Sequence, residues 1–258
     1  FVGSEGTLGI ITEITLKIYP QPEAISAAVC SFSSIANAVD TVIQAIQIGV
    51  PLARVEFVDE NGVRALNRYD KLTLPEKPLL LFEFHGSEHG VKEQAELVQQ
   101  IANEHGAMGF EWATRPEDRS RLWQARHNAY FALLQLRPGS RAISTDCCVP
   151  ISRLTECLLE TKADCDRENL IYGIVGHVGD GNIHLSVYQA DDERRSAFLH
   201  VLFARGVELG GAISGEHGIG TGKRAYLRRE LGDNAVDLMA TVKRALDPNN
   251  IMNPGKVI

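Results

Sequence analysis

The periodicity of the apolar residues constrains the fold more than any other feature of this chain, because it changes repeatedly between about two and about 3.6 residues. Short runs rich in β-branched and aromatic residues predict strands, over residues 24–32, 53–58, 79–85, 108–113, 141–149, 170–178 and 183–188. Longer runs with helical spacing predict helices, over residues 35–48, 87–105, 116–137, 151–167, 191–209 and 229–246. Ser33 or Ser34 is the expected cap of the first helix. This mixture, without a parallel-sheet pattern, predicts an α+β fold: a mainly antiparallel sheet covered by helices on one side.

The first 21 residues form a separate unit in this prediction. Residues 10–18 alternate imperfectly in β-branched residues and end at two prolines, which predicts one strand followed by a linker. The chain opens on Phe1 and enters a glycine-rich segment at once, a pattern typical of the middle of a domain. We therefore expect a fragment in which residues 1–21 complete a preceding domain and residues 22–258 form the next.

Composition restricts the classes of function. The chain has 258 residues, 44% of them hydrophobic, and a formal net charge of −7, as expected of a soluble globular protein with a sizeable core. The acidic balance and the lack of a basic run argue against nucleic-acid binding. No apolar stretch reaches the roughly 20 residues that cross a bilayer, so any membrane association is expected to be peripheral. The five cysteines form no CxxC pair, which favours free thiols in a reducing compartment over metal ligation.

Two glycine-rich segments contain the residues with the most chemistry. In the first, residues 176–184, three glycines and an asparagine permit a tight reversal that can bring His177 and His184 to the same side of a hairpin. Paired imidazoles suit Zn, Mn or Fe, and Asp180 could orient one of them. The alternative is a plain hairpin turn whose histidines bond to local backbone groups.

The second segment, residues 214–223, contains Glu216 and His217 among four glycines. Adjacent residues of an extended chain point in different directions, so separate roles are expected for these two side chains. Glu216 would complete a two-histidine, one-carboxylate metal site with open positions. His217 would be a general base, because histidine titrates near neutrality. A flexible loop with a solvated Glu-His pair is the alternative, and the presence of both segments together disfavours it.

Arg126 lies in a predicted helix, where its guanidinium could clamp a carboxylate through two hydrogen bonds. The alternative is a solvated arginine on an exposed helix face. Residues 247–256 follow the last predicted helix and form a turn-rich tail.

Several motifs in one order resemble a known family. They are residues 3–10, Ser144-Thr145-Asp146 followed by Val149-Pro150, residues 176–184, residues 216–220 and residues 253–256. This order resembles the flavin oxidases of the vanillyl-alcohol oxidase type, in the group of cytochrome-linked D-lactate dehydrogenase, the glycolate oxidase flavin subunit and D-2-hydroxyglutarate dehydrogenase. The resemblance covers essentially the whole chain.

The resemblance implies that residues 1–21 are the remnant of an FAD-binding domain, including its last strand. Residues 22–258 would be the FAD-linked oxidase C-terminal domain, or cap domain, whose extreme C-terminus returns to the flavin. FAD and a divalent metal, with Zn preferred, are the implied cofactors. The implied roles are metal ligation by His177, His184 and Glu216, base catalysis by His217, substrate binding by Arg126, and proximity to the flavin for Gly6, Gly9, Ile10 and Asn253. The main pyrophosphate-binding loops of the family precede Phe1, so the isolated chain is expected to hold FAD weakly and to be inactive.

The implied reaction is oxidation of a D-2-hydroxy acid to the 2-oxo acid by hydride transfer to FAD, with a quinone, a cytochrome or an electron-transfer flavoprotein as electron acceptor. The hydroxyglutarate branch has a lysine near Ser144 and an asparagine near Ser186, and their replacement here favours a monocarboxylate, D-lactate or glycolate. The implied setting is a homodimer or an oxidase-complex subunit, cytoplasmic or peripheral to the inner membrane, and mitochondrial in a eukaryote. Two alternatives stay open: a metal-dependent hydrolase that activates water at the same site, and a non-catalytic subunit.

Overall fold

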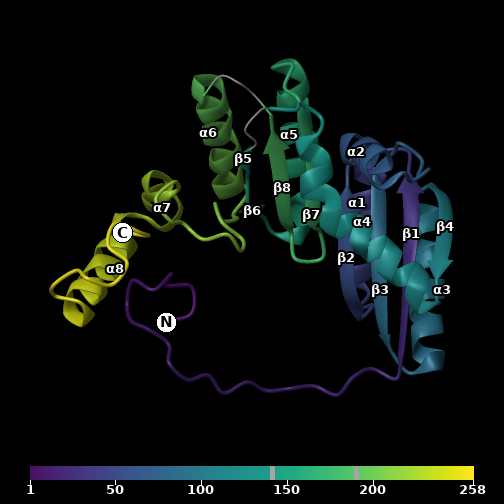
Figure 1. The fold of residues 1–258 in the computed structure, drawn as a ribbon, viewed down its shortest axis with the longest axis horizontal. Coiled ribbons are helices and arrows are strands. Elements are labelled where there is room, and N and C mark those ends of the chain that lie inside the picture. Colours follow the sequence, from purple (N-terminus) through teal and green to yellow (C-terminus); the bar gives the residue numbers. More distant parts are fainter. Residues whose placement is uncertain (140–142, 189–191) are drawn as a thin grey trace.

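The computed structural model describes residues 1–139, 143–188 and 192–258. These residues form one antiparallel sheet with helices packed on it, which confirms the predicted α+β class (Figure 1). The strand order is β4-β1-β3-β2-β7-β8-β5, and β6 also pairs with β8. The strands are β1 Ala24–Phe32, β2 Leu52–Val58, β3 Leu79–Gly86, β4 Ala107–Ala113, β5 Ile143–Ser144, β6 Cys147–Cys148, β7 Tyr172–His177 and β8 Asn182–Val187. The helices are α1 Ile35–Gln47, α2 Glu60–Asp70, α3 Glu88–Glu104, α4 Pro116–Leu134, α5 Leu154–Arg167, α6 Asp192–Glu208, α7 Arg224–Leu231 and α8 Asp233–Leu246, with a 3₁₀ turn at Ile151–Arg153.

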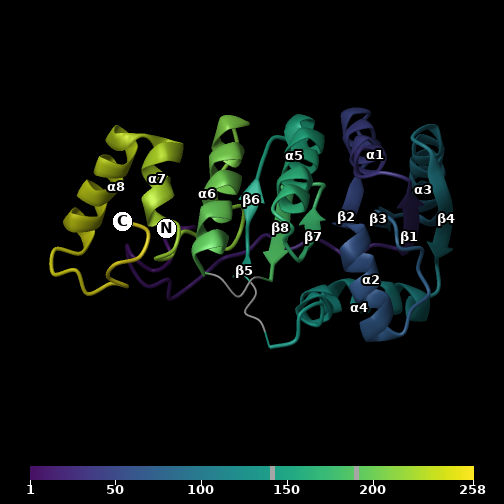
Figure 2. The same ribbon diagram turned by 90° about the horizontal axis from the view of Figure 1, so that it is seen from above.

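Helices cover both faces of the sheet rather than one. Figure 2 shows α1, α3, α5 and α6 in one layer above the strands, and α2 and α4 below them. The larger apolar core lies under the four-helix layer and includes Phe57, Phe82 and Leu158. The smaller core lies under α2 and α4 and includes Leu66 and Leu133. The second layer exists because α2, a helix with few apolar residues, forms after β2 and packs on α4.

Side-chain caps fix where three helices begin. Ser34, Asp59 and Ser87 each accept a hydrogen bond from the backbone amide three residues further on, at the start of α1, α2 and α3. The sequence predicts Ser33 or Ser34 as the cap of α1, and the residue that forms it is Ser34. Asp59 is the local feature that identifies the start of α2, a helix that periodicity alone does not predict.

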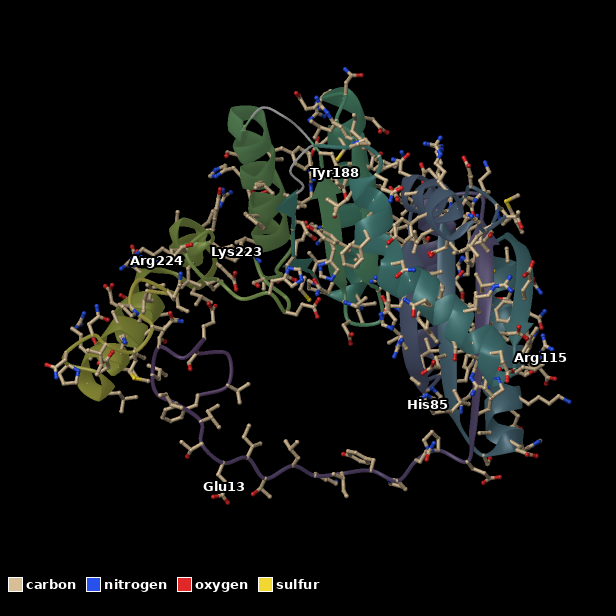
Figure 3. All side chains as sticks on the ribbon, in the orientation of Figure 1. Glu13, His85, Arg115, Tyr188, Lys223 and Arg224 are labelled. Carbon is tan, nitrogen blue, oxygen red and sulfur yellow. The ribbon has the colours of Figure 1, made fainter. Side chains whose placement is uncertain are left out.

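No strand forms over residues 10–18 in this structure. This segment runs extended along one side of the molecule, and Figure 3 shows the side chain of Glu13 projecting away from the sheet. Its apolar residues are exposed, Ile10 by 78% and Ile18 by 88%. A β-strand requires a hydrogen-bonded neighbour, and no strand within the described ranges pairs with this segment.

Two further predictions are corrected in detail. The single helix predicted over residues 229–246 is two helices, because Gly232, with φ of +79°, ends α7 and precedes α8. The strand predicted over residues 141–149 is interrupted between β5 and β6, where Thr145 and Asp146 turn toward the candidate site. Residues 141 and 142 of that prediction, and residue 191 of the predicted sixth helix, lie outside the described residues.

The two ends of the chain meet beside α7 and α8 (Figure 1). A small apolar cluster of Leu227, Val236 and Val257 holds α7, α8 and the C-terminal tail together. The side chain of Asn253 donates a hydrogen bond of 2.6 Å to the backbone carbonyl of Glu5. Within the described ranges no helix has the length and apolar character needed to span a membrane.

Candidate active site

The β7–β8 hairpin brings the two predicted histidines together. His177 is the last residue of β7, His184 lies within β8, and their ring centres are 5.1 Å apart. The turn between them requires Gly181, whose φ is +75°. A Cβ at this position would stand 2.1 Å from the carbonyl oxygen of Val149. The hairpin therefore has the tight, glycine-dependent reversal that the sequence predicts.

The loop between α6 and α7 places Glu216 and His217 over this pair of histidines. Glu216 Oε1 lies 3.4 Å from His177 Nε2, 3.1 Å from His184 Nε2 and 3.6 Å from His217 Nε2. The ring of His217 stacks on that of His184, with centres 4.9 Å apart and 13° between the planes. The two adjacent side chains do not diverge as expected of an extended chain, because the loop around them is bent rather than extended. Both meet at one cluster.

The second ring nitrogen of each β-strand histidine has a fixed acceptor. His177 Nδ1 lies 2.8 Å from Glu56 Oε1, and His184 Nδ1 lies 3.1 Å from the carbonyl oxygen of Thr145. Because each acceptor requires a proton on Nδ1, the Nε2 lone pairs of both rings are directed toward Glu216. Two imidazole lone pairs and a carboxylate oxygen, all within 4.8 Å of one another, are stable together only with a proton or a cation between them. A divalent transition metal prefers this donor set, so the residues fit the metal that the sequence implies.

The two histidines differ in their electrostatic surroundings. The hydrogen bond to the Glu56 carboxylate raises the pKa of His177. Burial lowers the pKa of His184, whose side chain is 8% exposed. When no metal is bound, a proton is therefore held more firmly by His177 than by His184.

Glu56, in β2, is a site residue that sequence reasoning missed. Its Oε1 bonds His177, and its Oε2 accepts hydrogen bonds of 3.2 and 2.9 Å from Nε and Nη2 of Arg126. Burial alone would raise its pKa, but the hydrogen bond from His177 and the charge of Arg126 hold the pKa of Glu56 below its usual value. The available signal was a single carboxylate in an otherwise apolar stretch of strand, Val55–Val58, since such a group is buried only when it is paired.

Arg126 lies on α4 at the edge of the cluster. It bonds Glu56, which in turn bonds the candidate metal ligand His177. Its side chain is 14% exposed. Arg126 also lines a pocket of about 360 Å³ under α4, but that pocket contains none of the clustered histidines. The chemistry is therefore assigned to the open cluster of polar groups rather than to this pocket.

Asp146, between β5 and β6, is a second missed residue. Its buried carboxylate accepts hydrogen bonds from the backbone of Glu216 and His217 and from the hydroxyl of Ser214. Burial would raise its pKa, but these donors, with the nearby charge of Lys223, hold the pKa of Asp146 well below its usual range. Figure 3 shows Lys223 at the start of α7, facing the sheet.

The residues predicted to lie near a flavin are distributed unevenly. Asn253 contacts residue 5 and so lies beside the N-terminal segment that contains Gly6. Gly6 has φ of +72°, and a Cβ there would meet nothing within 4 Å. Gly9 lies against the ring of Phe1, whereas Ile10 belongs to the exposed extended segment. The structure thus brings three of the four to one region and leaves Ile10 turned toward solvent.

A family model described as "FAD linked oxidases, C-terminal domain" matches residues 21–257. The chain belongs to this family. One curated relative is the probable mitochondrial D-lactate dehydrogenase of Danio rerio, which is 49% identical over all of this chain and 53% of the relative. The glycolate oxidase subunit GlcD of Bacillus subtilis is 34% identical over all of this chain and 56% of the relative. The chain thus spans about half the length of the curated relatives that it matches.

The FAD-linked oxidase C-terminal fold is also seen in solved structures. The 4-ethylphenol oxidase of Gulosibacter chungangensis superposes with a TM-score of 0.68 at 18% identity, over 94% of this chain and 55% of that one. This likeness concerns the fold alone. The family resemblance read from the motif order is confirmed, because both the family model and the relatives match the chain essentially from end to end.

Proposed function

We propose that this chain is the substrate-side part of an FAD-dependent dehydrogenase that oxidises a D-2-hydroxy acid to the 2-oxo acid. The observation that carries the proposal is the convergence of three histidine Nε2 atoms on one oxygen of Glu216. Arg126 lies beside them, linked through Glu56. The relatives named as D-lactate dehydrogenase and glycolate oxidase subunit support this class of substrate.

His177, His184 and Glu216 are the residues that would hold a divalent metal, with Zn preferred. When bound there, the metal supplies a positive charge that lowers the pKa of a substrate hydroxyl. Glu56 and the carbonyl oxygen of Thr145 hold the two imidazole rings in the tautomer that ligation needs. The half-exposed side chains of Glu216 and His217 leave the cluster open on the side where a substrate would enter.

The roles of the remaining residues follow from charge and position. Arg126 binds the substrate carboxylate, while Glu56 keeps its guanidinium aimed at the cluster. His217 takes the proton of the substrate hydroxyl at Nε2, the ring nitrogen that faces the cluster. Ser144 and Ser186 stand opposite each other in the β5–β8 pair and supply no cation for a second carboxylate, which supports a monocarboxylate such as D-lactate or glycolate.

Gly6, Gly9, Ile10 and Asn253 form the part of the chain that would approach FAD. When bound, FAD supplies the acceptor for the hydride of the substrate α-carbon. Residues 1–21 then belong to the flavin-binding part of the protein and residues 22–258 to the substrate side, so the isolated chain is expected to hold FAD weakly and to be inactive. A quinone, a cytochrome or an electron-transfer flavoprotein would reoxidise the flavin, and the mitochondrial relatives favour that location in a eukaryote.

The test compares flavin reduction in the full-length protein, loaded with FAD and metal, and in its His217→Ala variant. With D-lactate, the rate of flavin bleaching should fall by about 10²- to 10⁴-fold, the usual contribution of a general base. His89→Ala, which removes an exposed histidine from α3, is the control and should bleach at the normal rate. Bleaching by His217→Ala at an undiminished rate would refute the assigned base. Loss of bleaching after chelation tests the metal. Comparison of bleaching rates across a panel of 2-hydroxy acids tests the substrate class.

A further inference from the structure

The loop of residues 214–220 has no regular secondary structure, although it carries both Glu216 and His217. It contains glycines at 215, 218 and 220, and the last two have φ of +81° and +51°. Such a segment loses more backbone entropy on ordering than an ordinary loop does. Something outside the loop must therefore fix the two side chains, and the structure contains two carboxylates that bond its backbone amides.

The first carboxylate is that of Asp146, which is fully buried. Its Oδ2 accepts hydrogen bonds from the backbone amides of Glu216 at 3.0 Å and His217 at 2.7 Å. The same oxygen accepts the hydroxyl of Ser214 at 2.6 Å and lies 3.3 Å from Lys223 Nζ. The two amides belong to Glu216 and His217, so Asp146 fixes the backbone from which both functional side chains project.

The second carboxylate is that of Glu5, from the N-terminal segment. Its Oε1 accepts the backbone amide of Ile219 at 2.5 Å, and its Oε2 accepts that of Gly220 at 2.9 Å. Gly218 permits this approach, because a Cβ there would stand 2.6 Å from Glu5 Oε1. Glu5 therefore bonds the loop on the far side of His217 from Asp146.

We propose that Asp146 and Glu5 are positioning residues that clamp the loop from both ends and so hold Glu216 and His217 against the two β-strand histidines. The proposal rests on the proposed function for the roles of those two side chains. Hydrogen bonds from amides to an ionised carboxylate are stronger and shorter than neutral ones, which suits them to ordering a glycine-rich segment. Because Glu5 lies in residues 1–21, the clamp also links the flavin side of the protein to the metal ligands.

The test uses the full-length holoprotein loaded with FAD and its Asp146→Asn variant, with Asp59→Asn as a matched control. Asp59 is also a buried carboxylate that accepts a backbone amide, but it caps α2 and makes no bond to the loop. Four quantities are measured after the thermal midpoint has established that each protein folds. They are the dissociation constant for Zn²⁺ alone, kcat and KM for D-lactate, and hydrogen exchange of the amides of residues 216–220.

Asp146→Asn should weaken Zn²⁺ binding by about 10- to 100-fold, as losing the support of a metal ligand does elsewhere. We expect kcat to fall with it while KM changes little, because Arg126 is held by Glu56 and not by the loop. Amide exchange at residues 216 and 217 should accelerate, and Asp59→Asn should leave all four quantities unchanged. A merely structural role would lower the thermal midpoint without this separation of kcat from KM.

Wild-type Zn²⁺ affinity and wild-type kcat in folded Asp146→Asn would overturn the proposal. Should that variant fail to fold, Glu5→Gln replaces it, because Glu5 is only partly buried. That variant must then accelerate exchange at residues 219 and 220 and lower kcat, and unchanged values would refute the clamp. If the wild type binds no Zn²⁺, the proposed function loses its metal, and amide exchange in Asp146→Asn alone decides the clamp.

Discussion

Glu56 links the metal-site candidates to the substrate-binding candidate, and Glu56→Gln isolates what its charge contributes. The substitution keeps the shape of the side chain and one acceptor oxygen but removes the negative charge between His177 Nδ1, at 2.8 Å, and Arg126 Nη2, at 2.9 Å. Arg126 is then left largely buried without its counter-charge, and an amide can present its NH₂ group to the imidazole. Both the ion pair and the tautomer of His177 are affected.

The expected cost follows from the burial of the partners. Removing one member of a fully buried ion pair costs about 3–5 kcal/mol, and a hydrogen bond to a charged group contributes about 1.5–3 kcal/mol. Here the glutamine retains one hydrogen bond, and His177 is 33% exposed, so solvent screens part of the loss. We expect the free energy of unfolding to fall by about 2–3 kcal/mol. The Zn²⁺ dissociation constant should rise at least about tenfold, because the support of one ligand is lost.

Urea unfolding of the metal-free protein at neutral pH measures the first quantity, and chelator competition measures the second. Glu83→Gln is the matched control, because Glu83 in β3 also bonds a histidine, His85, at 2.9 Å. That contact is near the surface and includes no arginine, so its loss should cost about 0–1 kcal/mol and leave Zn²⁺ binding unchanged. Equal destabilisation by the two substitutions, or unaltered Zn²⁺ affinity in Glu56→Gln, would show that Glu56 does not support the site as argued.

Two further substitutions test the local structure. Gly181→Ala should lower the free energy of unfolding by about 3 kcal/mol or more, and Gly210→Ala by about 1 kcal/mol. Both glycines have positive φ, but only at Gly181 would the added Cβ stand 2.1 Å from a carbonyl oxygen. Similar urea midpoints for the two variants would contradict the packing argument. Asp59 is buried, which raises its pKa from 3.8 to about 7, so the folded state binds the proton more tightly than the unfolded one. The stability of the wild type should therefore fall as pH rises between those values, by on the order of 1 kcal/mol per pH unit, and Asp59→Asn should lack this slope; parallel pH profiles would count against the raised pKa.

Much of the fold could be predicted because its elements satisfy local rules. Strands such as β1, and helices such as α1 with its cap Ser34, carry both the periodicity and the boundary residue that define them. The failures occur where the structure depends on something distant. Residues 10–18 have a strand-like composition, but a strand forms only with a neighbour, and composition does not specify one. The helix α2 has few apolar residues and is stabilised by packing on α4, which lies far along the chain.

The candidate site divides in the same way. His177, His184, Glu216 and His217 could be named from sequence because they lie in short glycine-rich segments, where polar side chains have no role in packing. The partner of Glu56 could not be named, because Glu56 is 121 residues from the histidine that it bonds. Only the three-dimensional pairing of β2 with β7 brings them together.

The acidic side chains buried within the described ranges show how such supporting residues can be recognised once a structure exists. Burial by itself raises a carboxyl pKa, yet the pKa is lowered in Glu56, Asp146, Asp164 and Asp247, each of which bonds an arginine or a lysine. Asp59 has no such direct partner, and its pKa alone among the five is raised. Within the described residues, the buried acids with a lowered pKa are thus those that bond a cationic side chain. Of these four acids, Glu56 and Asp146 bond residues of the candidate site. Substitutions of these two carboxylates should therefore impair catalysis beyond their effect on folding stability.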